Sequence, residues 1–125
     1  MKRPRIQHVS VPRPPGSHAQ TRAFYGGLLG LEEKPVPDTI QHLDLIWYSL
    51  GGDTELHCFT EEPLEDRSGR HFCIEVDDVN VIRARLEKAG VEVRDPEPIN
   101  NRPRFFCRDP FGNTIEITTI LGSYA

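Results

Sequence analysis

The sequence has no long hydrophobic run. None of its apolar stretches approaches the ~20 consecutive residues that span a bilayer, so we expect no transmembrane helix. The basic stretch Met1–Arg5 leads into a strand-like run and not into the roughly 7–15-residue apolar core of a signal peptide. These absences predict a cytoplasmic protein that does not act at a membrane.

Cysteine is scarce, and positive charge is not in excess. The three cysteines, Cys58, Cys73 and Cys107, are odd in number, widely spaced and without a C-x-x-C pair, which argues against a disulfide framework. We interpret them as small hydrophobic residues on buried strands, with a nucleophilic cysteine as the alternative. The net charge of −4 gives no electrostatic reason to bind nucleic acid or an anionic membrane.

The 125 residues suffice for one domain that needs neither a disulfide nor a metal ion to fold. Within the single predicted domain, 1–125, two similar modules cover about 5–60 and 70–120, joined by a polar linker over 60–70. Leu29–Glu32 lies 60 residues before the similar Ala89–Glu92. Because one module is too small to cover its own sheet, we expect the two to pack together.

The sequence pattern of each module predicts the order strand–helix–strand–strand–strand, and therefore an α+β fold. In the first module we expect strands at Ile6–Val11, Leu31–Val36, Leu43–Leu50 and Thr54–Phe59, and a helix at His18–Leu29. In the second we expect strands at His71–Val76, Val91–Arg94, Arg104–Arg108 and Thr114–Ile120, and a helix from Asp77 or Asp78 to Ala89. The expected apolar stripes of the helices are Ala19, Ala23, Phe24 and Leu28, and Val79, Ile82, Leu86 and Ala89.

Polar side chains share one face of each predicted sheet. Alternation along the strands places them opposite the apolar face that a helix must cover. They are His8, His57, His71 and Glu116, with Glu55 nearby. If the sheets curl toward each other these groups converge, and imidazole and carboxylate are suitable ligands for a first-row divalent ion. The trio of His8, His71 and Glu116 is the core of this prediction.

Other polar and aromatic residues do not fit this pattern. His18 and His42 are interpreted as surface residues. Arg22, Arg102 and Arg104 are interpreted the same way, with anion contacts as the alternative. The aromatic residues Trp47, Phe59 and Phe105 are interpreted as core, or else as the lining of an apolar cleft.

Four segments carry recognisable motifs: Ile6–Val11, a first strand with a histidine; Phe24–Leu31, with an "FY…LGL" helix end; Arg70–Asp78, with "H-x-x-x-x-V-D-D"; and Arg108–Ile117, with "D-P-x-G-N-x-I-E". In this order they resemble the vicinal oxygen chelate superfamily, which includes glyoxalase, bleomycin resistance protein and extradiol dioxygenase. The resemblance extends over nearly the whole chain, and the last motif is the most specific.

The resemblance implies paired βαβββ modules that form a cup-shaped half-barrel around a divalent metal ion. It implies metal ligands at His8, His71 and Glu116. On the fourth strand, members of the family place either a glutamate, which would match Glu55, or a histidine, which would match His57. We prefer His57 as the fourth ligand, with Glu55 as a neighbouring group or a proton shuttle.

The resemblance also indicates the chemistry. A divalent ion (Zn, Ni, Co, Mn or Fe) would polarise a chelated oxygen substrate, and a carboxylate, Glu55 or Glu116, would move a proton. We therefore expect a metal-dependent lyase or isomerase of the glyoxalase type, acting on a small oxygenated molecule and forming a homodimer. The alternatives are an extradiol-type dioxygenase and a non-catalytic ligand-binding protein of the bleomycin-resistance type.

Overall fold

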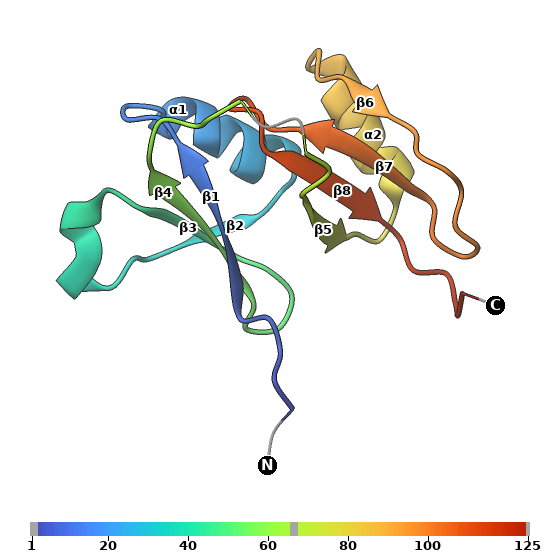
Figure 1. The fold of residues 1–125 in the computed structure, drawn as a ribbon, viewed down its shortest axis with the longest axis horizontal. Helices are drawn as coiled ribbons and strands as arrows, with labels where there is room; N and C mark the ends of the chain where they lie inside the picture. Colours follow the sequence, from blue (N-terminus) through green and yellow to red (C-terminus); the bar gives the residue numbers. More distant parts are fainter. Residues whose placement is uncertain (1–2, 66–67, 125) are drawn as a thin grey trace. The chain divides into compact units, whose positions relative to one another are not determined.

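The structure is a computed structural model and describes residues 3–65 and 68–124. Residues 66 and 67 of the predicted linker lie outside that part. The chain divides into two compact units, Met1–Leu64 and Glu65–Ala125. Each unit has a four-stranded mixed sheet and one helical segment between its first two strands. The α+β class and the duplicated βαβββ order are confirmed (Figure 1).

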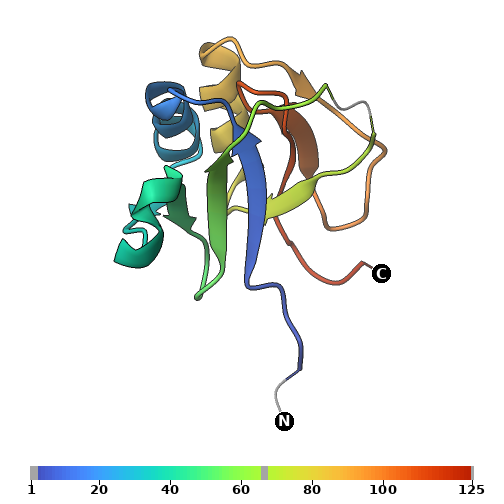
Figure 2. The same ribbon diagram turned by 60° about the vertical axis from the view of Figure 1, so that its left-hand side comes forward.

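The first unit has the strand order β1-β4-β3-β2. Its strands are β1 (His8–Arg13), β2 (Glu32–Lys34), β3 (Ile46–Ser49) and β4 (Glu55–Thr60). β1 runs parallel to β4, and the two other pairs are antiparallel. Figure 2 shows β1 beside β4. This parallel pairing joins the first and last strands of the module, so it brings residues more than 40 positions apart onto neighbouring strands.

Several element boundaries in the first unit differ from the prediction. β2 and β3 are shorter than the expected Leu31–Val36 and Leu43–Leu50. β1 continues through Pro12 and Arg13, where a loop was expected. Proline is tolerated there because β1 is an edge strand. The segment before β3 forms a 3-10 helix, η2 (Asp38–Leu43), which was not predicted because it has no apolar periodicity of its own.

The helical segment of the first unit begins as one α-helical turn, α1 (His18–Thr21), and continues as the π-helix η1 (Arg22–Leu28). The amide of Leu29 donates to the carbonyl of Phe24 at 3.0 Å, five residues back. This wider turn changes which residues are buried. Thr21, Phe24, Tyr25 and Leu29 are buried, whereas Ala19 and Ala23 of the predicted stripe are exposed, so that part of the prediction is wrong.

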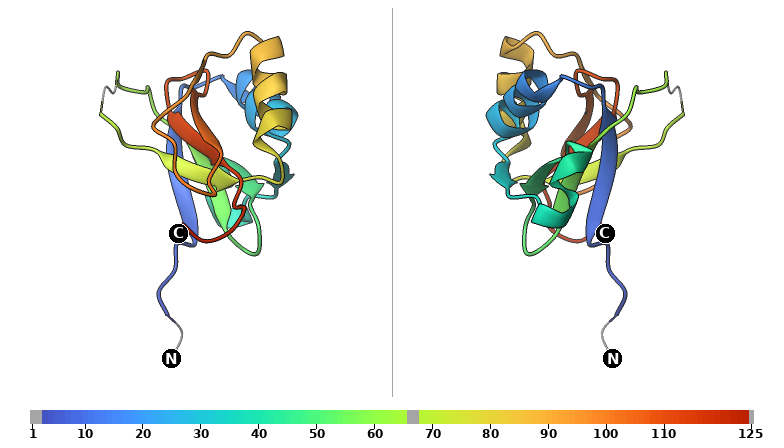
Figure 3. Two further views of the ribbon diagram at one scale, coloured as in Figure 1. Left: turned by 90° about the vertical axis from the view of Figure 1, so that its right-hand side faces the viewer. Right: turned by 90° about the vertical axis from the view of Figure 1, so that its left-hand side faces the viewer.

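The second unit has the equivalent strand order, β5-β8-β7-β6. Its elements are β5 (Phe72–Glu75), α2 (Val79–Lys88), β6 (Val93–Arg94), β7 (Arg104–Arg108) and β8 (Thr114–Thr118). Asp78 caps α2 by accepting a hydrogen bond from the Asn80 amide. α2 lies beside β6 (Figure 3) and buries Val79, Ile82 and Leu86. Ala89, the last residue of the predicted stripe, is exposed.

Each sheet has one apolar face, which forms the core of its unit. In the first unit this face carries Ile46, Tyr48, Leu56 and Cys58, all at most 2 % exposed. In the second it carries Phe105, Cys107, Ile115 and Ile117. The helical segments cover these faces, as the contact between the Tyr25 and Tyr48 rings and the stacking of Arg83 over Phe105 indicate. The alternate residues of the same strands therefore form the opposite, polar face.

A turn at Asp109 sets the register of β7 against β8. Its carboxylate accepts hydrogen bonds from the amides of Phe111 and Asn113, each at 2.9 Å, and from the Asn113 side chain at 2.7 Å. Gly112 adopts φ of +93°, which favours glycine. The turn aligns the strands so that Phe106 lies directly opposite Glu116.

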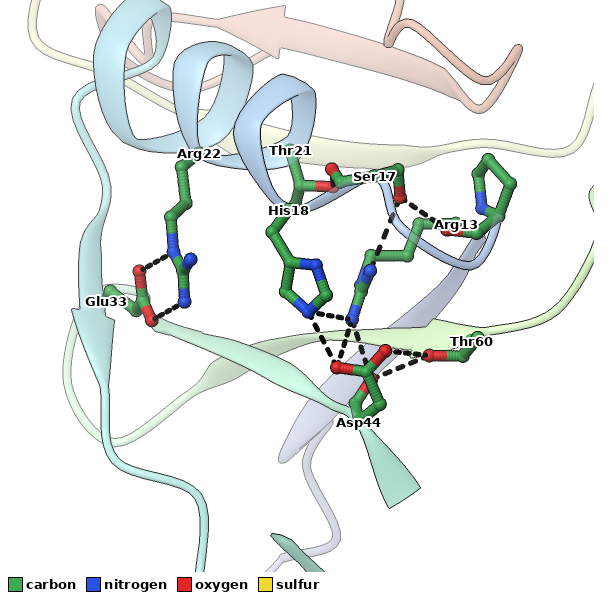
Figure 4. Close-up of polar contacts among 9 residues, drawn as sticks. Arg13, Ser17, His18, Thr21, Arg22, Glu33, Asp44 and Thr60 are labelled. Atoms are coloured by element: carbon green, nitrogen blue, oxygen red, sulfur yellow. Dashed lines mark hydrogen bonds and ion pairs between the residues drawn. The ribbon is translucent and has the colours of Figure 1, made fainter. Parts of the chain in front are cut away.

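A buried arginine joins three segments of the first unit (Figure 4). Arg13 is fully buried and pairs with Asp44, whose Oδ1 lies 3.1 Å from Nη2. Nη2 also donates to the Asp44 carbonyl at 2.7 Å. His18 Nε2 lies 2.7 Å from the same Asp44 Oδ1, so His18 is not an isolated surface residue as predicted. Its hydrogen bond is the main cause of the lowered pKa of Asp44.

No helix within residues 3–65 and 68–124 has the length and apolar character to cross a membrane.

Candidate functional site

The polar face of the first sheet carries a stack of three rings from three strands. The imidazole of His57 on β4 lies between the ring of His8 on β1, at 4.1 Å, and the indole of Trp47 on β3, at 3.8 Å. The planes of His57 and Trp47 differ by only 3°. The stack follows from strand register, because Trp47 is the cross-strand partner of His57.

Glu55 lies beside this stack and is held by two groups. Its Oε1 accepts a hydrogen bond from His57 Nε2 at 2.8 Å, and its Oε2 pairs with the ammonium group of Lys34. The hydrogen bond from Lys34, followed by that from His57, lowers the pKa of Glu55 to about 2. Desolvation is the main cause of a lowered pKa at His57. At neutral pH the pair is therefore a carboxylate and a neutral imidazole.

The polar face of the second sheet holds the other two predicted ligands in direct contact. His71 Nε2 lies 3.0 Å from Glu116 Oε1. The His71 ring meets the Phe106 ring edge-on at 4.8 Å, and Arg104 Nη1 donates to Glu116 Oε2 at 3.4 Å. The Glu116 side chain is 14 % exposed, so its carboxylate is largely shielded from solvent.

All three histidines have one ring nitrogen engaged with an oxygen. Nδ1 of His8 donates to Gln7 Oε1 at 2.7 Å, Nε2 of His57 to Glu55, and Nδ1 of His71 to the Gly69 carbonyl at 2.8 Å. In the neutral rings the other nitrogen then carries a lone pair. Metal-binding histidines are oriented in this way by an acceptor on their second nitrogen.

The pair of His71 and Glu116 also has the chemistry of a cation site. If the single proton of a neutral His71 ring is on Nδ1, the Nε2 lone pair faces a carboxylate oxygen 3.0 Å away. Two acceptors at that separation repel each other unless a cation lies between them, either a proton on Nε2 or a metal ion. The donor set therefore fits a divalent metal ion.

The duplicated fold relates the two sheets position by position. Glu116 pairs with Cys73 on one side and Phe106 on the other, whereas His57 pairs with Ser10 and Trp47. His57 and Glu116 are therefore equivalent positions. His8 and His71 are equivalent as well, because each lies two residues before Ser10 or Cys73. Glu55 is equivalent to Thr114, because Glu55 lies two residues before His57 and Thr114 lies two residues before Glu116.

Among residues 3–65 and 68–124, no three His, Cys, Asp or Glu side chains form a ready cluster for a metal ion. Each unit contributes a pair, His8 with His57 and His71 with Glu116.

Several predictions for other residues can be assessed. Phe105 is core, at 0 % exposed, while Trp47 and Phe59 are half-buried. His42 is exposed as predicted. Cys58 and Cys107 are buried as predicted, whereas Cys73 is exposed. Burial raises the pKa of Cys107 to about 12, and desolvation together with the charge of Glu116 raises that of Cys73 to about 11. Neither thiol therefore has the thiolate character of a nucleophile.

The three arginines weighed as anion contacts have different environments. Arg22 forms an exposed pair with Glu33 (Figure 4), and Arg102 stacks on the Tyr124 ring. Arg104 is not a surface residue, because its side chain is only 15 % exposed. Sequence reasoning also missed Lys34, on the polar face of the first sheet, and Arg94, on the polar face of the second. Only the register of β2 and β6 against their neighbours identifies them.

Comparison with known proteins relates the whole chain to one family. The model of the Glyoxalase/Bleomycin resistance protein/Dioxygenase superfamily matches residues 5–117. No curated protein matches the sequence. A glyoxalase family protein from Bacillus anthracis is 32% identical, with a TM-score of 0.85, over 96% of this chain and 98% of that chain.

Two more distant structures share the fold. A lactoylglutathione lyase from Agrobacterium tumefaciens has a TM-score of 0.63 at 21% identity, over 94% of this chain and 96% of that one. A fosfomycin resistance protein from Listeria monocytogenes has a TM-score of 0.75 at 15% identity, over 98% and 96%. With its duplicated βαβββ order and the match over residues 5–117, the chain belongs to the glyoxalase/bleomycin resistance protein/dioxygenase superfamily.

Proposed function

We propose that this protein is a metal-dependent lyase or isomerase of the glyoxalase type, with His8, His57, His71 and Glu116 as ligands of one divalent ion. The observation that carries the proposal is the shared state of the three histidines. Each has a ring nitrogen hydrogen-bonded to an oxygen, and the second ring nitrogen of His71 faces the Glu116 carboxylate at 3.0 Å. The equivalence of His57 with Glu116 favours His57 over Glu55 as the fourth ligand.

The bound ion would polarise a carbonyl or hydroxyl oxygen of the substrate and acidify a neighbouring C–H bond. Glu116 is the group we assign to accept that proton, because its carboxylate is largely shielded and directed at the His71 side of the site. Arg104 donates to the other carboxylate oxygen and so holds Glu116 in place. The substrate class is a small molecule with two neighbouring oxygen atoms.

Glu55 has a positioning role in this proposal. Its pairing with Lys34 and His57 lowers its pKa to about 2, which makes it a weak base at neutral pH. The same pairing makes it a permanent acceptor for His57 Nε2–H, and this fixes the imidazole tautomer. Proton transfer is therefore assigned to Glu116 and orientation of His57 to Glu55.

Measurement of metal content tests the first part of the proposal, that the protein binds one divalent ion. Untagged protein, stripped with chelator and reloaded separately with Zn, Ni, Co, Mn or Fe(II), is assayed by elemental analysis and titration. We expect one ion per chain, about 100-fold weaker binding in His57→Ala and about tenfold weaker binding in Glu55→Gln. His42→Ala, an exposed histidine, is the control and should bind as the wild type does. Absence of binding under every loading condition would refute the proposal.

The reaction class needs a separate measurement. Loaded protein is incubated in D₂O with small 2-oxo and 2-hydroxycarbonyl compounds, and exchange at the carbon beside the carbonyl is followed by NMR. Exchange that Glu116→Gln abolishes would support lyase or isomerase chemistry. Oxygen uptake with a catechol and Fe(II), without such exchange, would instead identify a dioxygenase.

A further inference from the structure

The polar faces of the two sheets carry matching cross-strand rows. In the first unit the row is Ser10, His57, Trp47 and Lys34; in the second it is Cys73, Glu116, Phe106 and Arg94. Each row contains a small residue, a proposed metal ligand, an aromatic residue and a cation. Lys34 and Arg94 are thus equivalent positions, one on β2 and the other on β6.

The two cations differ in whether a carboxylate neutralises them. Lys34 pairs with Glu55, two residues before His57 on β4. The position equivalent to Glu55 in the second unit is Thr114, which has no charge. Among the residues that the structure describes, Arg94 makes no ion pair, and its guanidinium lies over the Phe106 ring at 4.7 Å from the centroid. The second sheet therefore retains a cation but lacks the acid that would match it.

A hollow of about 1150 Å³ lies at this place in the second unit, with His71, Arg94, Arg104, Phe106 and Thr114 in its lining. Its volume is somewhat above the roughly 300–1,000 Å³ that is usual for small-molecule sites. Arg104 donates to the Glu97 carbonyl and to Glu116, but its buried Nε has no hydrogen-bond partner. A buried N–H without an acceptor is costly, so an incoming acceptor would be favoured.

Other charges around the hollow do not remove this preference. Arg108 adds a third guanidinium, and the acidic lining residues are Glu92, Asp95 and Glu97. Asp95 already pairs with Arg83 on α2. Glu97 offers its backbone carbonyl to Arg104. Of the two guanidinium groups over the Phe106 ring, Arg104 pairs with Glu116, whereas Arg94 makes no ion pair with the residues that the structure describes.

We propose that Arg94 and Arg104 bind an anionic oxygen group of the substrate, a carboxylate or a phosphonate or phosphate, in the hollow that both residues line. This inference rests on the proposed function, because His71 lines the same hollow and contacts Glu116. It narrows the substrate to a molecule that carries this anion in addition to the oxygen atoms bound by the metal ion. Planar guanidinium groups bind both kinds of anion in a bidentate manner.

The test uses chelator-treated, metal-free protein of full length. Methylphosphonate and propionate are titrated separately, and the arginine Nε–H signals are followed by NMR. We expect saturable shifts of the Arg94 and Arg104 signals, and about tenfold weaker binding in Arg94→Gln. The probe that binds more tightly distinguishes a phosphonate or phosphate from a carboxylate. Arg85→Gln, an exposed arginine on α2, is the control and should bind as the wild type does.

Thr114→Glu provides a sharper test, because it restores the missing carboxylate. We expect it to abolish binding of both probes, while Thr114→Gln, of equal size but uncharged, retains binding. Equal loss in both variants, or equal binding by Arg94→Gln and wild type, would overturn the inference. Because the titration needs no metal, failure of metal binding with intact anion binding would refute the proposed function alone.

Discussion

The imidazole of His57 lies on the indole of Trp47, with ring centroids 3.8 Å apart and planes within 3° of parallel. Trp47 is the only tryptophan of the chain, so its fluorescence reports on one proposed metal ligand. The contact is a direct consequence of register, since the two residues are paired across β3 and β4.

We expect binding of a divalent ion to change Trp47 emission in a saturable way, reaching its endpoint at one ion per chain. The reason is that a ligated or protonated imidazole places positive charge against the face of the indole. Titration of metal-free protein by fluorescence measures this. The His57→Gln variant should lose the fluorescence response, and the His42→Gln variant should keep it. An unchanged response in His57→Gln would show that Trp47 emission does not report on metal binding at His57.

Replacing Glu55 by Gln should lower the free energy of unfolding at pH 7 by about 1–2 kcal/mol, after allowance for solvent screening at the half-exposed Lys34. Because its pKa is lowered to about 2 in the folded protein, the stabilisation is present above the ordinary carboxyl pKa near 4.5. It is lost as the pH falls toward 2. Urea unfolding of both proteins between pH 7 and pH 2 should therefore show a difference that closes over this range. A constant difference would contradict the ionic pairing.

Asp44→Asn should destabilise the first unit by about 2 kcal/mol, because it removes the carboxylate that pairs with the fully buried Arg13. Asparagine suits the position, since Asp44 has a left-handed backbone with φ of 57°. The pKa of Asp44 is lowered, so the loss should vanish in acid as the wild-type carboxylate is protonated. Denaturant unfolding of the wild type and the variant, at neutral and at acid pH, measures this loss of stability. Asp53→Asn, which removes an exposed pair with Arg5, should have little effect, and an equal effect would contradict the burial argument.

Asp109→Ala should cost about 2–3 kcal/mol of stability, because two backbone amides lose the buried Asp109 carboxylate as their acceptor. The Asp109→Asn variant keeps one acceptor oxygen and should therefore lose less stability than Asp109→Ala. Thermal unfolding ranks the variants, and NMR contacts between Phe106 and Glu116 report whether the β7–β8 register survives. Wild-type stability in Asp109→Ala would show that Gly112 and Asn113 suffice for the turn.

Much of the fold could be predicted from periodicity and turn residues. The alternation along Glu55–Thr60 and Thr114–Thr118, together with the Asp109–Asn113 turn, predicted which faces are buried. The π-helix at Arg22–Leu28 was not predictable in this way, because a pattern with four-residue spacing fits both helix types. The role of His18 was also missed, since its partners Arg13 and Asp44 lie in other segments.

The sequence by itself determined the duplicated βαβββ order, the buried alternation of each strand and the candidate ligands His8, His57, His71 and Glu116. These follow from local chemistry, because strand period and turn preferences act over a few residues. Only the tertiary structure decided which residues meet across strands. The parallel pairing of β1 with β4 and of β5 with β8 brings together residues more than 40 positions apart. That register makes His57 equivalent to Glu116 and pairs Lys34 with Glu55, and among the described residues it gives Arg94 no carboxylate partner. The reason is that cross-strand neighbours are set by hydrogen-bond alignment and not by distance along the chain.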